Sequence, residues 1–484
     1  MSRPDLQDRS LSTRSKEPAF EEKTTEDAYA PPNSLVKGTA VLSRTNSMIS
    51  TASDESGRDI KLRTMSWKRT AAVLFGEYVC IAIVSFPSSF MALGYVGGII
   101  ATLGIGVVTL YTSLTLWKFQ MKHPECHDIC DIGYKLFGNS RIAYELTTFG
   151  LLANNLMILG LHTSTGAKVF DTLTNSQYCN IIWAVVTMII CILLSLPRTL
   201  TQVSVQSVIS AILMFTSIML CMVFAGIQDE PAGYIAGTTV HASPWSPPGT
   251  TFVAGFNAIL NITYTFIGQI CYPSFIAEME NPADFPKALY ACTVAEFILF
   301  TIPGVVIYVY LGQYTVAPAF AGLQPIYKKI AFTMALPTII VIGVIYANVT
   351  AKYLFNRIYR NSRHRYSNTW QGWGMWTALI IIVWVLGFII GEAVPFFADL
   401  LSLISSLFDS FFGLIFWGYA FLVLNKGNWF TSKSQTMWTL LNMLIIVIGV
   451  VIFGVGIYTS IQSILDDYQL GAVRFPFTCA SSAI

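Results

Sequence analysis

Charged side chains are scarce in this chain. Asp, Glu, Lys and Arg make up 12% of its 484 residues, and it has only five histidines. A soluble globular domain carries about 25% charged residues, so the composition excludes an ordinary soluble protein. Hydrophobic residues make up 54% of the chain and aromatic residues 13%. This composition indicates a protein that crosses a lipid bilayer several times.

Motifs of enzymatic chemistry are missing as well. The sequence has no HExxH motif, no Gly-rich phosphate loop and no acyl-transfer constellation. We therefore expect no enzymatic activity, no cofactor, no metal and no nucleic-acid partner. In "HPECHDIC", the side chains of His123, Cys126, His127 and Cys130 have spacings that resemble zinc ligands. Structural zinc sites organise small domains, however, and a polar loop ahead of a helix explains this short stretch better.

Eleven mostly apolar segments predict transmembrane helices. A span needs about 20 such residues, and hydrocarbon offers no partner to an open strand edge, so each span must be helical. A tight turn at Gly391, Glu392 and Pro395 separates the ninth from the tenth. The predicted spans are residues 70–92, 96–117, 143–167, 179–197, 203–226, 251–276, 288–312, 330–354, 374–392, 394–424 and 436–462.

The polar ends of the chain complete the domain organisation. Residues 1–65 are rich in Ser, Thr, Lys, Glu, Asp and Pro without apolar periodicity, so we expect a disordered tail. This tail has no apolar core of a signal peptide and no Gly for myristoylation. The eleven-helix membrane domain is expected at 66–462, followed by a short C-terminal tail at 463–484.

Lys and Arg are distributed unevenly between the two sides of the predicted spans. Cytoplasmic loops carry the excess of Lys and Arg. With the N-terminus in the cytosol, the outer side holds only Lys328, Lys329 and Arg474, with Lys168 near the outer end of the third span. The C-terminus is then extracellular or luminal. The seventeen inner residues are Lys61, Arg63, Lys68, Arg69, Lys118, Lys122, Lys135, Arg141, Arg198, Lys287, Lys352, Arg357, Arg360, Arg363, Arg365, Lys426 and Lys433.

Two outer cysteines raise the question of a disulfide. Cys179 and Cys479 both fall on the outer side, and the sequence leaves open whether they are bonded. The sequons at Asn261 and Asn348 lie inside predicted spans, so we expect neither to be glycosylated.

The first and sixth spans carry residues that interrupt a helix. The sixth has Gly268 and Gln269 in its middle. The first has a small-residue stretch at Cys80 to Ala82, followed by Pro87, which cannot donate a backbone hydrogen bond. Pro and Gly are common in membrane helices. Two interruptions at equivalent positions of a five-helix repeat nevertheless indicate the binding site of a secondary transporter.

The ends of the half-helices predict how a substrate binds. Backbone N–H groups at a half-helix N-terminus suit a carboxylate, and carbonyls at a C-terminus suit an ammonium group, so a zwitterion fits both. We expect the carboxylate at Ile83 to Ser85, the ammonium at Thr265 to Phe266 and Cys80, and the substrate side chain towards Phe266. The predicted substrate-binding residues are Cys80, Ala82, Ile83, Val84, Ser85, Thr265, Phe266, Gly268 and Gln269.

Ionisable residues inside spans are costly and are therefore functional candidates. Glu77 lies about one turn before the first interruption. Its structural alternative is an ion pair with Lys352 or Arg357. No sodium-specific set of ligands stands out. The candidates for proton coupling, in order, are Glu77, Asp409, Glu296 and His162.

Four stretches resemble the amino acid/auxin permease family, and in particular the neutral amino acid permeases of filamentous fungi. The resemblance covers about residues 65–462, and "AEMENPADFPKAL" is its most specific motif. Many members carry Gly-x-Gly where this chain has Cys80-Ile81-Ala82, which makes the first interruption bulkier. The four stretches are "VSFPSSFMALGYVGG" (84–98), "HPECHDICDIGYKLFG" (123–138), "FIGQICYPSFIAEMENPADFPKAL" (266–289) and "VPFFADLLSLISSLFDSFFGLIF" (394–416).

The resemblance implies an all-α membrane protein of eleven transmembrane helices, with a leucine-transporter-type 5+5 inverted repeat and one extra helix. It implies import of neutral and aromatic amino acids by proton symport, with the amino acid, the proton and the lipid bilayer as partners. It also favours the plasma membrane over the vacuolar membrane. The alternative is a non-transporting amino acid receptor of transporter fold, which a liposome flux assay would distinguish.

The N-terminal tail resembles the tails that recruit ubiquitin-ligase adaptors in fungal permeases. It holds Lys16, Lys23 and Lys37, the acidic stretch "FEEKTTED" and the Ser/Thr-rich stretch "SRTNSMISTASDES". Deletion of residues 2–60 should leave transport intact and lengthen the lifetime of the protein at the cell surface, measured by surface biotinylation. An unchanged lifetime would show that the tail only solubilises this end of the chain.

The distribution of Lys and Arg also predicts which loops are accessible from outside. A single Cys introduced between residues 227 and 250 should react with an impermeant thiol reagent in intact cells, whereas one between 355 and 372 should not. Protection of the first position with labelling of the second would reverse the predicted orientation.

Overall fold

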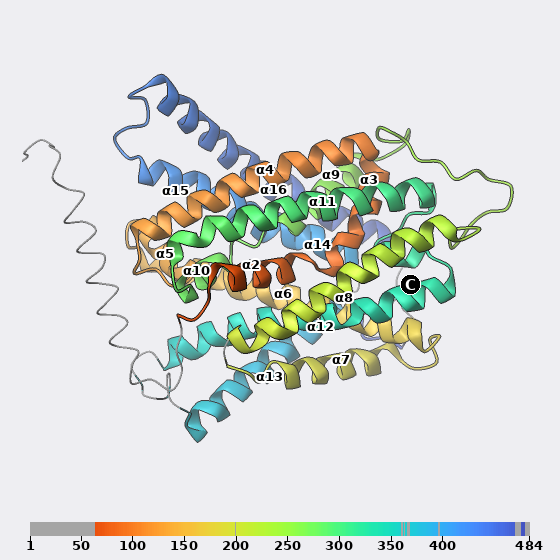
Figure 1. Cartoon of the computed structure of the whole chain (residues 1–484), viewed down its shortest axis with the longest axis horizontal. Coiled ribbons are helices and arrows are strands. Elements are labelled where there is room, and N and C mark those ends of the chain that lie inside the picture. Colours follow the sequence, from red (N-terminus) through yellow and green to blue (C-terminus); the bar gives the residue numbers. More distant parts are fainter. Residues whose placement is uncertain are drawn as a thin grey trace, which may run out of the picture. The chain divides into compact units, whose positions relative to one another are not determined.

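In a computed structural model of the chain, the described residues form a bundle of helices (Figure 1). They belong to a unit that spans Asp59–Ile484. Of the predicted tail, only residues 63–65 are described; Lys16, Lys23 and Lys37 lie outside the described residues. The described residues are 63–198, 200–359, 362, 364, 368–394, 397–469 and 476–479.

The first half of the bundle runs from α2 to α8. Its helices are α2 (Trp67–Tyr78), a 3₁₀ turn (Ile81–Ser85), α3 (Phe86–Leu93), α4 (Tyr95–Lys122), α5 (Ile129–Leu136), α6 (Arg141–Leu173), α7 (Asn180–Leu194) and α8 (Leu200–Ile227).

The second half runs from α9 to α16. Its helices are α9 (Phe252–Phe266), α10 (Tyr272–Glu278), α11 (Phe285–Leu311), α12 (Pro325–Ile358), α13 (Trp370–Ala393), α14 (Phe397–Ile404), a π-helical segment (Ser405–Ile415), α15 (Phe416–Leu424) and α16 (Lys433–Gln469). Short 3₁₀ turns lie at Pro282–Asp284, Gly312–Tyr314 and Ala319–Gly322.

Nine helical stretches among the described residues are long and apolar enough to cross a membrane. The chain is therefore a multi-pass membrane protein. Two of the eleven predicted spans correspond to shorter apolar helices, α7 and α9, of 15 residues each. The helix predicted to end at 462 continues to Gln469, because Ile461, Ile464 and Leu465 keep the helical apolar spacing into the polar stretch.

Small residues bring the long helices close together. Between α6 and α13, a Cβ on Gly391 would lie 2.4 Å from the carbonyl oxygen of Gly160. Lipid tails are as apolar as leucine, so helices in a membrane associate through such close packing and not by excluding water. A larger side chain at Gly391 would separate α6, which carries part of the site described below, from α13.

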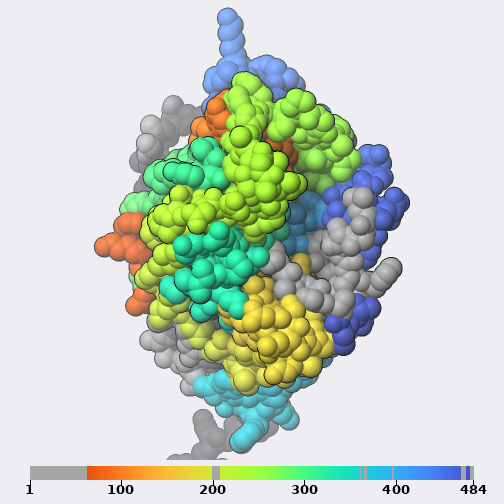
Figure 2. Space-filling model, turned by 90° about the vertical axis from the view of Figure 1, so that its right-hand side faces the viewer, coloured from red at the N-terminus to blue at the C-terminus, as the bar shows by residue number. Residues whose placement is uncertain are grey.

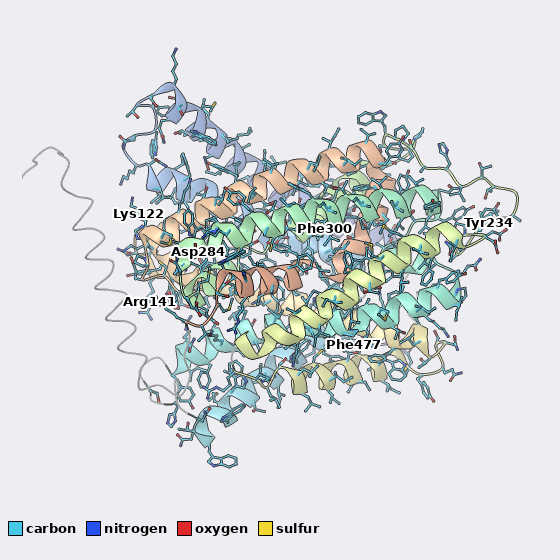
Figure 3. The ribbon with its side chains drawn as sticks, viewed as in Figure 1. Lys122, Arg141, Tyr234, Asp284, Phe300 and Phe477 are labelled. Atoms are coloured by element: carbon cyan, nitrogen blue, oxygen red, sulfur yellow. A yellow bond between two sulfur atoms is a disulfide. The ribbon has the colours of Figure 1, made fainter. Side chains whose placement is uncertain are left out.

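The two ends of the bundle differ in charge. Figure 3 shows Lys122, Arg141 and Asp284 at one end and Tyr234 at the other. The first end also holds the start of α2 and the end of α12, with their basic residues Lys68 and Lys352. We call it the basic end.

At the basic end, backbone hydrogen bonds join the segment before α2 to the end of α10. The Met65 N–H donates to the Glu278 carbonyl at 3.1 Å, and the Glu280 N–H donates to the Met65 carbonyl at 2.9 Å. This pairing is the only β-bridge among the residues that the structure describes. An ion pair between Lys352 of α12 and Glu278 at the end of α10 joins the same place. The segment that leads into α2 is therefore tied to the end of α10.

A long loop covers the opposite end. The loop 228–251, yellow-green in Figure 2, lies beside the teal connection between α11 and α12. The Tyr95 N–H donates to the Ser243 carbonyl at 3.1 Å. Gly94 has a φ of +74°, and a Cβ there would lie 2.3 Å from the backbone of Trp245. Only glycine permits this approach, so the loop is seated directly on the junction between α3 and α4.

The question of the outer cysteines is answered by the structure. Cys179 and Cys479 form a disulfide that links the residue before α7 to the C-terminal part of the chain. Cys126, ahead of α5, and Cys130 of α5 are buried. Burial raises the pKa of the Cys126 thiol to about 12 and raises that of Cys130 as well. Among the described residues, no cluster of His, Cys, Asp and Glu could hold a metal ion.

Candidate functional site

The first interruption separates α2 from α3. Helix α2 ends at Tyr78, and Cys80 is extended, with φ −115° and ψ 173°. A 3₁₀ turn follows from Ile81, and α3 begins at Phe86. Pro87 is the second residue of α3, where its missing N–H costs nothing because the first N–H groups of a helix have no partner inside it. The new helix therefore starts where the proline permits it.

The second interruption separates α9 from α10. Helix α9 ends at Phe266, and α10 begins at Tyr272 with Pro273 as its second residue. Both second half-helices thus begin with an aromatic residue, a proline and a serine: Phe86-Pro87-Ser88 and Tyr272-Pro273-Ser274. This repeated triplet is a further sign, readable in the sequence, that the two interruptions occupy equivalent positions.

The two interruptions meet inside the bundle. The hydroxyl groups of Tyr78 and Tyr272 are hydrogen-bonded to each other. A Cβ on Gly268 would lie 2.8 Å from the Tyr78 hydroxyl and 3.2 Å from the ring of Tyr272. Gly268 therefore allows the second interruption to rest against the first.

A cavity of about 40 Å³ lies between them. One water molecule needs roughly 10–15 Å³ by this measure, so the space holds only a few waters. An amino acid could enter only if the lining residues moved apart. The lining residues are Glu77, Tyr78, Cys80, Ile81, Ala82, Asn154, Ile158, Leu161, His162, Tyr264, Thr265, Ile267, Gly268, Ile270, Ile342, Tyr346 and Asp409.

Four of the predicted substrate-binding residues line this cavity: Cys80, Ala82, Thr265 and Gly268. The residues predicted to meet the carboxylate do not line it. The structure places Ile83, Val84 and Ser85 further into the 3₁₀ turn, where the Ile83 N–H already donates to the Cys80 carbonyl at 3.2 Å. The turn starts at Ile81, earlier than expected, so the first backbone N–H groups are those of Ile81 and Ala82.

Phe266 and Gln269 do not line the cavity either, and their side chains contact other helices. The Phe266 ring packs against Phe300 of α11, with ring centroids 4.9 Å apart. Gln269 Nε2 donates to Thr112 Oγ1 of α4 at 3.2 Å. Because the chain is not helical between α9 and α10, sequence spacing does not give the direction of the Gln269 side chain. The expected contact between the substrate side chain and Phe266 is not what this geometry offers.

Three of the four ionisable candidates line the cavity, namely Glu77, His162 and Asp409, whereas Glu296 does not. Each of the three is at most 6% exposed. Three of their polar atoms have no hydrogen-bond partner among the described residues: Glu77 Oε2, His162 Nδ1 and Asp409 Oδ2. Buried polar atoms are nearly always paired, so these atoms indicate a place built to receive another molecule or a proton.

The structural alternative for Glu77 was wrong. The Tyr346 hydroxyl of α12 donates to Glu77 Oε1 at 2.8 Å. Lys352 pairs with Glu278, and Arg357 pairs with Glu145 of α6 at 2.8 Å. Both basic residues lie further along α12, near the basic end, so they have carboxylates of their own there.

Sequence reasoning named His162 of α6 but missed the other lining residues of α6 and those of α12. Asn154, Ile158 and Leu161 come from α6, and Ile342 and Tyr346 come from α12. The adjacent asparagines at 154 and 155, in the middle of an apolar span, could have marked α6 as a polar-lined helix. Nothing in the sequence singles out the isoleucines, which look like ordinary core residues.

Comparison with known proteins places this geometry in a family. Residues 63–462 match the family of transmembrane amino acid transporter proteins. The chain is 32% identical over 426 residues to the N amino acid transport system protein of Neurospora crassa, covering 87% of this chain and 90% of that protein. It is 30% identical to a transmembrane transporter of Gibberella moniliformis, covering 88% and 89%.

Two solved structures share the fold. MhsT, solved in complex with L-phenylalanine, has a TM-score of 0.50 and 13% identity, covering 82% of this chain and 100% of its own. The nucleobase-cation-symport-1 family transporter Mhp1, solved with bromovinylhydantoin bound, has a TM-score of 0.51 and 14% identity, covering 87% and 95%. The resemblance noted in the sequence is confirmed, as is the expectation that the protein is a transporter and not an enzyme. This chain belongs to the transmembrane amino acid transporter family.

Proposed function

We propose that the protein imports neutral amino acids, including aromatic ones, across the plasma membrane by proton symport, with alternating access around α2–α3 and α9–α10. The cavity between these two interruptions carries the proposal. It combines free half-helix ends, a buried carboxyl group at Glu77 and a mainly apolar lining.

The proposed architecture has eleven spans, in which α7 and α9–α10 cross the membrane despite their short helices. Five of the spans form each inverted repeat, and α16 is the extra helix. The equivalent Phe86-Pro87 and Tyr272-Pro273 starts support this pairing, as does the fold shared with two solved structures. Residues 66–462 are the transporter, residues 1–65 the cytoplasmic tail and residues 463–484 the outer tail. The basic end then faces the cytosol.

The substrate backbone is recognised by the half-helix ends. The carboxylate meets the N–H groups of Ile81 and Ala82, where the 3₁₀ turn begins. The ammonium faces the carbonyls at the end of α9, near Thr265, because the C-terminus of a helix carries about −0.5 of an elementary charge. The structure of MhsT with L-phenylalanine supports an amino acid in a fold of this kind.

The lining limits the substrate side chain. Burial of a charge among apolar side chains is costly unless the charge is paired, and no Lys or Arg occurs among the described residues that line the cavity. Neutral, apolar side chains are therefore preferred. The apolar lining residues are Ile81, Ile158, Leu161, Ile267, Ile270 and Ile342.

Glu77 carries the coupled proton. Its carboxyl group lies at the end of α2, beside the first interruption, and one of its oxygens is unpaired. In the outward-facing protein a proton from outside neutralises this group, and in the inward-facing protein the proton leaves to the cytosol. A buried, neutral carboxyl group allows the helices to move without a charge in the apolar interior.

Recognition by backbone groups makes Gly268 more important than its neighbour Gln269. Gly268→Val places a branched side chain within 3 Å of the Tyr78 hydroxyl and should raise the apparent Kd or KM for substrate by about tenfold or more. Gln269→Ala should have the smaller effect, since its side chain faces α4. Uptake of labelled amino acid measures both.

Gly255→Val is the matched control for Gly268→Val. Gly255 lies in α9, and nothing lies within 4 Å of a Cβ built there. Its substitution should leave the apparent affinity unchanged. Equal losses in the two valine variants, or a larger loss in Gln269→Ala, would contradict recognition by the interrupted backbone.

Glu77→Gln should abolish accumulation driven by a pH gradient while sparing exchange of internal for external amino acid. Glutamine fits the same space but cannot bind and release a proton. In wild-type proteoliposomes, acidic external pH should raise uptake, and in the variant uptake should not respond to pH. Asp399→Asn, a change in a buried carboxyl group of α14 outside the cavity, is the control. Unchanged pH-driven accumulation in Glu77→Gln would move the coupling role to Asp409, Glu296 or His162.

A further inference from the structure

Asp409 enters the cavity from a part of the bundle that the interrupted helices do not supply. It lies in the π-helical segment Ser405–Ile415, between α14 and α15. Only 6% of its surface is exposed, and its Oδ2 atom has no hydrogen-bond partner among the described residues. Glu77 also has one unpaired oxygen, Oε2, while its Oε1 accepts a hydrogen bond from Tyr346. Asp409 is therefore a second buried carboxyl group of the cavity with an oxygen that lacks a partner.

The backbone around Asp409 is π-helical, and this geometry sets the direction of its side chain. π-helical turns are rare in proteins, and those that occur often lie at functional sites. A π turn inserts a residue and so rotates the side chains relative to a regular α-helix. Four residues further on, a Cβ on Gly413 would lie 2.3 Å from Ile267 Cδ1, so the missing side chain lets the segment pack against the second interruption. The position of Asp409 is thereby tied to the end of α9.

The groups around Asp409 favour the binding of a positively charged group. Thr265 lines the same cavity at the end of α9, where the carbonyl groups concentrate negative charge. The described lining residues include no Lys or Arg that could neutralise a carboxylate. A buried carboxylate without a partner is costly, and an ammonium ion is the cation that an amino acid brings with it.

We propose that Asp409 binds the α-ammonium group of the substrate and makes the site select amino acids over their α-hydroxy counterparts. This inference rests on the proposed function and deepens it. The carbonyls at the end of α9 accept hydrogen bonds from the ammonium, and Asp409 supplies the charge. An α-hydroxy acid has the same carboxylate and side chain but no positive charge, so it leaves Asp409 unpaired.

The test is a competition assay in proteoliposomes under exchange conditions, which need no pH gradient. L-Phenylalanine, L-leucine and L-alanine are compared with L-phenyllactate, L-2-hydroxy-4-methylpentanoate and L-lactate as inhibitors of labelled amino acid exchange. Wild-type protein should prefer the best amino acid over its hydroxy analogue. Asp409→Asn, which removes the charge and keeps the shape, should reduce this preference by about tenfold or more, since charge-assisted hydrogen bonds are about twice as strong as neutral ones.

Two further variants keep the test decisive. Asp409→Glu retains the charge at a shifted position and should keep part of the preference, which also covers the case in which Asp409→Asn does not fold. Asp399→Asn is the control, because Asp399 is a buried carboxyl group at the start of α14 that does not line the cavity; it should leave the preference unchanged.

The outcomes separate the two proposals. A wild-type preference that survives in Asp409→Asn overturns the inference about Asp409 and leaves amino acid transport standing. Loss of pH-driven accumulation in Asp409→Asn with an intact preference assigns Asp409 to proton coupling and likewise overturns it. If wild-type protein exchanges none of the three amino acids, the proposed function itself fails, and this inference fails with it.

Discussion

Inside hydrocarbon, every backbone N–H and C=O group must find a partner within the protein. This constraint shapes the whole bundle, because a helix may be interrupted only where the freed groups face protein or a cavity. Here the two interruptions face each other, in contact through Tyr78, Tyr272 and Gly268. Residues 81–85 of the first interruption and 267–271 of the second are buried within the protein. The freed groups then recognise an amino acid in our proposal.

The same constraint governs the ionisable side chains. Glu77, His162 and Asp409 come from three separate parts of the bundle and converge on one small cavity. Burial of such groups is costly, and their unpaired atoms add to that cost. The Met65 backbone pairing lies at the basic end of the bundle, and the loop seated on Gly94 lies at the other end.

Much of this molecule can be predicted from short-range properties of the sequence. The number of consecutive apolar residues predicts each transmembrane helix, because the thickness of the bilayer dictates how many residues a spanning helix needs. The interruptions at Pro87 and Gly268 are also local, since a missing N–H or a missing side chain acts on its own turn of helix. For the same reason Glu77 and Asp409 stand out, as charges are rare in apolar stretches.

By itself, then, the sequence determined that this is a membrane protein and where its apolar spans lie. It also determined which residues interrupt the spans or place ionisable groups in them. Each of these properties depends on neighbours a few positions away. Only the tertiary structure decided which of these residues share a cavity. Tyr346, and not Lys352, lies beside Glu77, and Gln269 faces α4. Such partners are hundreds of residues apart or lie on non-helical backbone. Their meeting depends on how the helices pack and where a π turn rotates Asp409, and neither follows from periodicity.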